Sequence, residues 1–286
     1  DAPVLFDTNR RIHFVGIGGV GMSGIAEVLL NLGYRISGSD LAESDMTTRL
    51  IRNGAHIVYG HHADHVRPDT DVVVISSAVK YANPEVVRAR ELMIPIIPRA
   101  EMLAELMRLK YGIAVAGTHG KTTTTSLVAN ILEEARLDPT IINGGVINSL
   151  KNNAQLGKSE WAVIESDESD GSFLKLPITY SIVTNVDKEH IDFYGSFEKL
   201  KKSFCTFIEK TPSFGKSLIC IDNDNLKSLL PKCKTLNFLT YGFDKRSNYQ
   251  ITNVRKNKNY SIFDLKLKFP SKKTANIKNI VVNLIG

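Results

Sequence analysis

The stretch Ile113-Ala114-Val115-Ala116-Gly117-Thr118-His119-Gly120-Lys121-Thr122 limits the fold of this 286-residue chain more sharply than any other. Its apolar start predicts a buried strand, and the pattern from Thr123 to Ala135 predicts a helix. Strand, glycine loop, Lys-Thr and helix are typical of nucleotide triphosphate sites, because the loop N–H groups and the helix N-terminus face the phosphates. The usual spacing has a glycine where this chain has Val115, so the loop is a shortened form. We expect it to bind ATP or GTP.

A second glycine loop lies near the N-terminus. Gly16-Ile17-Gly18-Gly19-Val20-Gly21 follows a predicted strand, Arg11 to Val15, and precedes a helical pattern, Met22 to Leu32. The spacing is the dinucleotide fingerprint, and Asp40 ends the next predicted strand. The loop can hold any pyrophosphate and Asp40 can accept from any ribose hydroxyl, so NAD and a UDP-linked substrate both fit. A dehydrogenase does not need an ATP loop, whereas an ATP-driven enzyme acting on a nucleotide-linked substrate needs both loops.

Strands and helices alternate along the chain, which predicts parallel sheets covered by helices. We expect an α/β protein with a polar leader at residues 1–10, a Rossmann-like domain at residues 11–109 and a P-loop ATPase-like domain at residues 110–286. From about Tyr249 the pattern changes to a period of two, best seen in residues 261–269. This alternation predicts an antiparallel ribbon at the edge of the second domain.

Acidic residues follow two predicted strands of the second domain. Residues 161–164 run into Glu165-Ser166-Asp167-Glu168-Ser169-Asp170, and residues 181–184 run into a segment that contains His190. Strand ends of such sheets point into the ligand crevice, where carboxylates can hold Mg²⁺ beside the phosphates. For His190 alone, a metal or phosphate contact and a structural role are equally open.

Composition excludes several classes of protein. Hydrophobic content is 43% and charged content is 23%, as in ordinary globular proteins. Residues 201–286 carry 17 Lys and Arg against 5 Asp and Glu, but these are scattered without an arginine-rich helix or aromatic pattern. We therefore expect neither a nucleic-acid partner nor a membrane. The three cysteines are widely spaced without C-x-x-C, which predicts reduced thiols in a cytoplasmic protein and no disulfide framework.

The motifs together resemble the Mur ligases of peptidoglycan synthesis, over nearly the whole chain. The matching segments are Gly16 to Ala26, Ser37-Gly38-Ser39-Asp40, Ser76-Ser77-Ala78, Arg99 to Leu103, Ala116 to Thr124, Asn143-Gly144-Gly145, Glu165 to Asp170, and Thr184-Asn185 with His190 and Asp192. The loop ending in Gly21-Met22-Ser23 favours the member of the family that adds L-alanine.

The resemblance implies an ATP-dependent ligase that joins L-alanine to the lactyl carboxylate of UDP-N-acetylmuramate through an acyl phosphate. It implies roles for Lys121 at the β- and γ-phosphates, for Thr122 on one Mg²⁺ and for Glu165 with His190 on a second. The expected ATP-binding residues are Gly117, Thr118, His119, Gly120, Lys121, Thr122 and Thr123. The expected UDP-sugar-binding residues are Gly18, Gly19, Val20, Gly21, Met22, Ser23, Asp40, His61, Ser76, Ser77 and Arg99.

In one respect the chain departs from the family. In the family a His-Asn segment, the rest of the central domain and a third domain follow the position of Leu284-Ile285-Gly286. We therefore expect an incomplete central domain and no useful turnover by this chain alone. Two related interpretations stay open: a fragment that binds without chemistry, and the ligase that attaches a recycled tripeptide to the same UDP sugar.

Overall fold

The computed structural model describes residues 8–19, 21–76, 78–142, 154–166, 168 and 178–283. Two compact units are present, one formed by Asp1–Gly112 with Thr125–Glu165 and the other by Ile113–Thr124 with Ser166–Gly286. The domain boundary expected near residue 110 stays a prediction.

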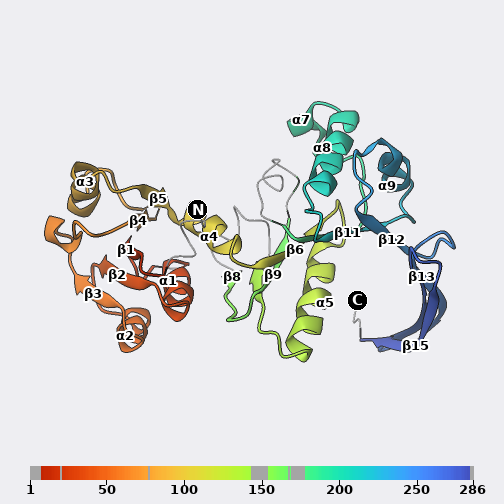
Figure 1. The fold of residues 1–286 in the computed structure, drawn as a ribbon, viewed down its shortest axis with the longest axis horizontal. Helices are drawn as coiled ribbons and strands as arrows, with labels where there is room; N and C mark the ends of the chain where they lie inside the picture. Colours follow the sequence, from red (N-terminus) through yellow and green to blue (C-terminus); the bar gives the residue numbers. More distant parts are fainter. Residues whose placement is uncertain are drawn as a thin grey trace. The chain divides into compact units, whose positions relative to one another are not determined.

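A five-stranded parallel sheet forms the start of the first unit, with the strand order β3-β2-β1-β4-β5 (Figure 1). The order reverses between β1 and β4, which is where open α/β sheets bind their ligands, beyond the carboxyl ends of the strands. The elements are β1 (Arg11–Val15), α1 (Met22–Asn31), β2 (Arg35–Asp40), α2 (Asp45–Arg52), β3 (His56–Tyr59), η2 (Ala63–His65), β4 (Val72–Ile75), α3 (Pro84–Glu91), β5 (Ile96–Pro98) and α4 (Arg99–Met107).

Local sequence signals set the helix starts in this sheet's surroundings. Ser44 and Thr47 form a reciprocal capping box at α2. Asn83 accepts a hydrogen bond from Glu85 N at the start of α3, where Pro84 occupies the first turn. One cluster of the core packs between the sheet and α3, and its buried members are Val15, Val66, Val73, Ala89 and Ile94.

The first unit also holds β7 (Thr140–Ile142), β8 (Ala154–Gln155) and β9 (Trp161–Glu165). β7 is parallel to β9 and antiparallel to β8. Lys110 Nζ donates to the carbonyls of Gly157 and Ser159, at 3.3 and 2.5 Å. Burial lowers the pKa of Lys110, and the nearby charge of Asp138 opposes this effect.

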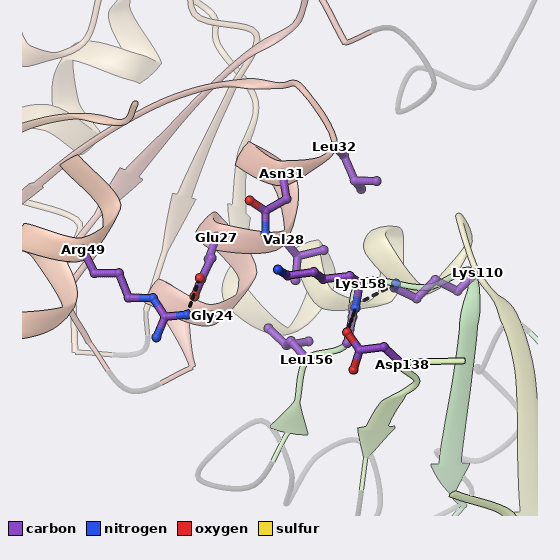
Figure 2. A pocket seen from close by; sticks show the side chains of 11 residues that line it. Gly24, Glu27, Val28, Asn31, Leu32, Arg49, Lys110, Asp138, Leu156 and Lys158 are labelled. Atoms are coloured by element: carbon purple, nitrogen blue, oxygen red, sulfur yellow. Dashed lines mark hydrogen bonds and ion pairs between the residues drawn. The ribbon is translucent and has the colours of Figure 1, made fainter. Parts of the chain in front are cut away.

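Lys110 also lines a cavity of about 270 Å³ in the first unit (Figure 2). Its other walls come from α1, from Arg49 of α2 and from the turn around Leu156. The Arg49 guanidinium is paired with the Glu27 carboxylate at 2.8 Å. The glycine loops supply no residue to its lining, so the cavity does not contribute to the sites predicted from the sequence.

In the second unit, β6 (Tyr111–Ala116) is parallel to β10 (Tyr180–Val183), and β11 (Lys216–Cys220) and β12 (Phe238–Gly242) extend the sheet in parallel. The ribbon predicted from the alternating pattern is confirmed, since β13 (Tyr249–Lys256), β14 (Ser261–Lys268) and β15 (Thr274–Val282) pair antiparallel. The described helices of this unit are α7 (Ile191–Tyr194), α8 (Phe197–Glu209), α9 (Asp224–Leu229) and the short η4 (Leu230–Lys232), and α5 (Lys121–Glu134) belongs to it only up to Thr124.

The expectation of three reduced thiols is wrong in this structure. A disulfide joins Cys205 of α8 to Cys233, which follows η4, and their Cα atoms are 5.4 Å apart. Cys220 is free. The two bonded residues are 28 positions apart in the sequence. Their spacing could not show this pairing, because it depends on how α8 packs against the α9–η4 segment in the core.

The architecture confirms the predicted fold class, an α/β protein with parallel sheets. Among the helices of the described residues, none combines the length and apolar character needed to cross a bilayer.

Candidate functional site

The residues expected to bind the UDP sugar lie at the carboxyl ends of the five parallel strands. Gly16 follows β1, Asp40 ends β2, His61 follows β3, Ser76 follows β4 and Arg99 follows β5. Of the residues expected to bind the UDP sugar, Gly19, Asp40, His61 and Ser76 line one cavity of about 500 Å³, together with Gly16 and six further residues. Because parallel strands bring their carboxyl ends to one edge, residues spread over more than 80 positions meet at one site.

The first glycine loop is built by left-handed glycines and by hydrogen bonds to β2. Gly16 and Gly21 both have φ of +79°. The N–H groups of Gly16 and Ile17 donate to Ser39 O at 2.8 and 2.9 Å. Gly18 N donates to Asp40 Oδ2 at 2.7 Å, and a Cβ on Gly18 would lie 2.8 Å from that oxygen. Asp40 therefore braces the loop as well as lining the cavity.

Arg99 brings a positive charge to the same loop. A Cβ on Gly21 would lie only 2.3 Å from Arg99 Nη1, so the guanidinium sits directly against the loop backbone. Burial lowers the pKa of Arg99, but guanidinium remains charged in proteins. The loop therefore brings a cation to the N-terminus of a helix, which suits a diphosphate, while the N–H groups of Gly18 and Gly19 already donate within the protein.

Two predicted residues of this site have buried side chains. Met22 is fully buried, and its N–H donates to Gly19 O at 3.1 Å. Ser23 is 4% exposed, and its hydroxyl lies 3.5 Å from the same carbonyl oxygen. Both residues shape the loop and start α1 in this structure.

The second glycine loop joins β6 to α5 and is held by the segment that follows β10. Thr118 N donates to Asn185 O at 3.1 Å, and His119 N donates to Asn185 Oδ1 at 2.8 Å. Thr184 Oγ1 donates to His119 O at 2.8 Å. Gly117 has φ of +146° and no room for a side chain, because a Cβ would lie 1.9 Å from Thr184 Oγ1. Two N–H groups expected to face phosphates are thus already used by Asn185.

Lys121, Glu168 and His190 form a charged cluster beside this loop. Lys121 Nζ donates to Glu168 Oε2 at 2.8 Å and to Gly117 O at 2.7 Å. His190 Nε2 lies 3.4 Å from the other carboxylate oxygen of Glu168. The Glu168 side chain is 1% exposed, and its main-chain carbonyl accepts from the Tyr194 hydroxyl. A buried ion pair is a weak source of stability, so its presence in a glycine loop indicates a role in binding.

The sequence analysis predicted roles for Lys121 and His190 but none for Glu168. It is one of four carboxylates in residues 165–170, and the sequence alone does not show which of the four pairs with Lys121. Glu165 ends β9 and is 8% exposed, and Ser166 N, directly after it, donates to Val115 O of β6 at 2.8 Å. The acidic segment therefore begins, at Ser166, beside β6, the strand that leads into the second glycine loop.

His119 forms a more exposed cluster on the same loop. Its Nε2 lies 3.3 Å from Asp187 Oδ2 and 3.4 Å from Glu189 Oε1. Several predicted residues lie outside the described part of the chain: Val20, Ser77, Asn143-Gly144-Gly145, Asp167, Ser169, Asp170 and Leu284-Ile285-Gly286.

The donor set near the second loop fits a hard divalent cation and a phosphate. Within the second unit it offers the carboxylate of Glu168 and the imidazole of His190, which lie 3.4 Å apart, and the hydroxyl of Thr122 next to Lys121 in the sequence. The oxygen donors of this set suit Mg²⁺, whereas an imidazole is a more usual ligand of transition metals. Glu168 Oε1 is also buried without a hydrogen bond among the described residues, as expected of an atom that has a further partner in the complex.

Family profiles match both parts of the chain. The profile described as "Mur ligase family, catalytic domain" matches residues 11–111, and the profile described as "Mur ligase middle domain" matches residues 115–286. The chain belongs to the Mur ligase family. This Mur ligase chain spans about half to three fifths of the length of the curated relatives that it matches.

Two curated relatives and one solved structure are alanine ligases by name. The chain is 51% identical over 275 residues to the UDP-N-acetylmuramate--L-alanine ligase of Pelagibacter ubique, which covers 96% of the chain and 59% of that protein. It is 57% identical over 255 residues to the protein of that name from Myxococcus xanthus, covering 88% and 54%. Among solved structures, the UDP-N-acetylmuramate-alanine ligase of Thermotoga maritima matches with 30% identity and a TM-score of 0.53, covering 93% of this chain and 60% of that one.

A ligase whose name gives a different second substrate is also similar to this Mur ligase chain. The UDP-N-acetylmuramate:L-alanyl-gamma-D-glutamyl-meso-diaminopimelate ligase of Neisseria meningitides matches with 26% identity and a TM-score of 0.58. The match covers 97% of this chain and 89% of that one. The identity to this protein is about half that to the two curated alanine ligases.

Proposed function

We propose that this chain is the UDP-sugar-binding and ATP-binding part of an ATP-dependent ligase of peptidoglycan synthesis, which joins L-alanine to the lactyl carboxylate of UDP-N-acetylmuramate. The observation that carries the proposal is the presence of two glycine loops at strand ends in a member of the Mur ligase family. Arg99 lies against the first loop, and Lys121 follows the second. The higher identity to alanine ligases favours L-alanine over a tripeptide as the second substrate.

In the first unit, the diphosphate of the UDP sugar lies on the loop from Gly18 to Met22. The N–H groups and Arg99 supply the positive side of this contact. Asp40, His61 and Ser76 line the same cavity as Gly19 of the loop, where the diphosphate and the group next to it bind. Ser77 and Val20 keep their predicted roles at this site.

In the second unit, the phosphates of ATP lie between the loop and the start of α5. Lys121 leaves Glu168 and stabilises the β- and γ-phosphates, whose charge is several times that of the carboxylate it replaces. Thr122 would hold one Mg²⁺, and Glu165 with His190 would hold a second. These ions would offset the charge of the phosphates against the incoming carboxylate. Glu168 remains beside His190 and orients its ring.

The proposed reaction has two steps. The lactyl carboxylate attacks the γ-phosphorus, and ADP leaves, giving an acyl phosphate. The amine of L-alanine then attacks the acyl carbon, and inorganic phosphate leaves through a tetrahedral intermediate. The contribution of this chain is to place the two substrates in line and to neutralise charge through Lys121. We propose the cytoplasm as its location, since the nucleotide-linked substrate and ATP are both available there.

Isothermal titration of UDP-N-acetylmuramate and then Mg²⁺-ATP into the chain tests the proposal. UDP-sugar binding is expected, with weaker binding of ATP and no product from the chain alone. A version continued to the full length of its relatives should ligate L-alanine and not the tripeptide. Binding of NADH in place of the UDP sugar, or preference of the full-length version for the tripeptide, would contradict the proposal.

A further inference from the structure

A buried carboxylate lies behind the UDP-sugar cavity. Glu85, the second residue of α3, is fully buried. Its Oε1 lies 2.7 Å from His13 Nε2, and its Oε2 accepts from Ser39 Oγ at 2.6 Å and lies 2.6 Å from His61 Nδ1. A carboxylate in such a place is costly unless donors surround it. These contacts bring together α3, two neighbouring strands and the loop after β3.

The ionisation of Glu85 fixes the hydrogen on His61. Burial raises the pKa of the Glu85 carboxyl, but hydrogen bonds from His13, Ser39 and His61 outweigh it and hold the pKa below its usual value. An ionised carboxylate only accepts hydrogen bonds, so the proton of the neutral His61 ring must lie on Nδ1. Among the contacts of the described residues, none uses His61 Nε2, and this nitrogen is the one left for a ligand.

A diphosphate requires a donor at that nitrogen. With Nδ1–H committed to Glu85, Nε2 is an acceptor in the neutral ring and becomes a donor only when the ring gains a second proton. Phosphate oxygens only accept, and Nε2 meets them favourably only in the imidazolium form. The Glu85 carboxylate, 2.6 Å from Nδ1, keeps that hydrogen in place while Nε2 meets the ligand.

We propose that Glu85 is a positioning residue of the UDP-sugar site: it orients His61 through Nδ1, so that binding of the diphosphate takes up one proton at His61 Nε2. The inference rests on the proposed function, because it assumes a UDP sugar in the cavity that His61 lines. It adds a buried residue and a proton to that site.

The other ionisable groups around His61 leave this assignment intact. His13 is 1% exposed, and its second nitrogen lies 2.9 Å from Ser37 Oγ, which removes it from contact with a ligand. His65 Nδ1 lies 3.5 Å from Glu85 Oε1 and is the competing site for a proton. Asp40 and Lys80 are the other charged residues of the cavity lining. His62 pairs with Asp64 at 3.4 Å.

Calorimetry in buffers of different ionisation enthalpy measures the proton directly. UDP-N-acetylmuramate is titrated into the chain at pH 7.5, and the slope of enthalpy against buffer enthalpy gives the protons taken up. We expect uptake approaching one proton, and an affinity that falls up to tenfold per pH unit as the pH rises to 8.5. Glu85→Gln should abolish the uptake and weaken binding at least tenfold, and His61→Gln should also abolish the uptake.

Matched variants separate this role from a general loss of structure. His62→Gln removes a neighbouring exposed histidine and should keep the uptake. His61→Gln leaves the buried carboxylate in place and serves if Glu85→Gln does not fold, as judged by its thermal unfolding. Binding without proton uptake, or uptake lost only in His65→Gln, would overturn the inference while the proposed function stands. Absence of UDP-sugar binding at every pH would overturn both.

Discussion

The loop at Gly16 holds negative charge with backbone N–H groups and a guanidinium from another strand end, whereas the loop at Gly117 carries its own lysine. In the first loop, Gly18 N donates to Asp40, and in the second, Lys121 pairs with Glu168. In both, a carboxylate from a neighbouring strand end occupies a donor that a phosphate can use. The loops differ in the cation: Arg99 already lies against the backbone of the first loop, whereas a phosphate reaches Lys121 of the second only when a buried ion pair opens.

The sharpest test of this difference is Lys121→Met. It should lower acyl phosphate formation by the full-length version by about 10²–10³-fold, because charge stabilisation of the transferred phosphate is lost. UDP-sugar binding should not change, since among the described residues the Lys121 ammonium donates to Gly117 and Glu168, both of the second unit. Single-turnover formation of the acyl phosphate measures the effect. Lys202→Met removes an exposed lysine of α8 and is the control.

Reduction of the disulfide tests whether the two units are stabilised differently. Reducing Cys205–Cys233 removes a cross-link between residues 28 positions apart, so the unfolded chain gains conformational entropy. We expect the free energy of unfolding to fall by about 2–4 kcal/mol. Urea unfolding with and without dithiothreitol, and of Cys205→Ser, should show this loss. Cys220→Ser, at the free cysteine, should leave the reductant effect in place. Equal stability of the oxidised and reduced chain would contradict the prediction.

Two alanine substitutions compare glycines within the second loop. Gly117→Ala places a Cβ 1.9 Å from Thr184 Oγ1, whereas Gly120→Ala meets no atom within 4 Å. Both positions have positive φ, which costs about 1–2 kcal/mol for alanine. We expect Gly117→Ala to be more destabilising by about 2 kcal/mol, through the additional collision. Urea unfolding measures both, and equal losses would show that the Thr184 contact yields at no cost.

The smallest effect is expected in the acid unfolding of the first unit. The folded-state pKa of Glu85 lies below its ordinary value of 4.5, so its contribution to stability is present above pH 4.5 and is lost as the pH falls through the folded-state value. Urea midpoints of Glu85→Gln between pH 3 and 6 should depend less on pH than those of the unchanged chain. An identical pH dependence would mean that Glu85 binds protons equally in the folded and unfolded states.

Much of the fold could be predicted from the sequence. The strand at Arg11–Val15 begins and ends where the apolar pattern places it. Helix and strand ends elsewhere differ by one to three residues, as in α1, which ends at Asn31 instead of Leu32. These signals are local: a period of apolar residues, a cap and a glycine turn act within a few positions of each other.

The sequence by itself determined the order of elements, the two loops and the residue types at the strand ends. Only the tertiary structure decided which side chains meet. Lys121 pairs with Glu168, Cys205 bonds to Cys233, and Glu85 lies against His61, although these partners are separated by 24 to 47 positions. Such contacts depend on strand order and on how helices pack. The free energy of a buried charge then selects the partners, since each must find a donor once water is excluded.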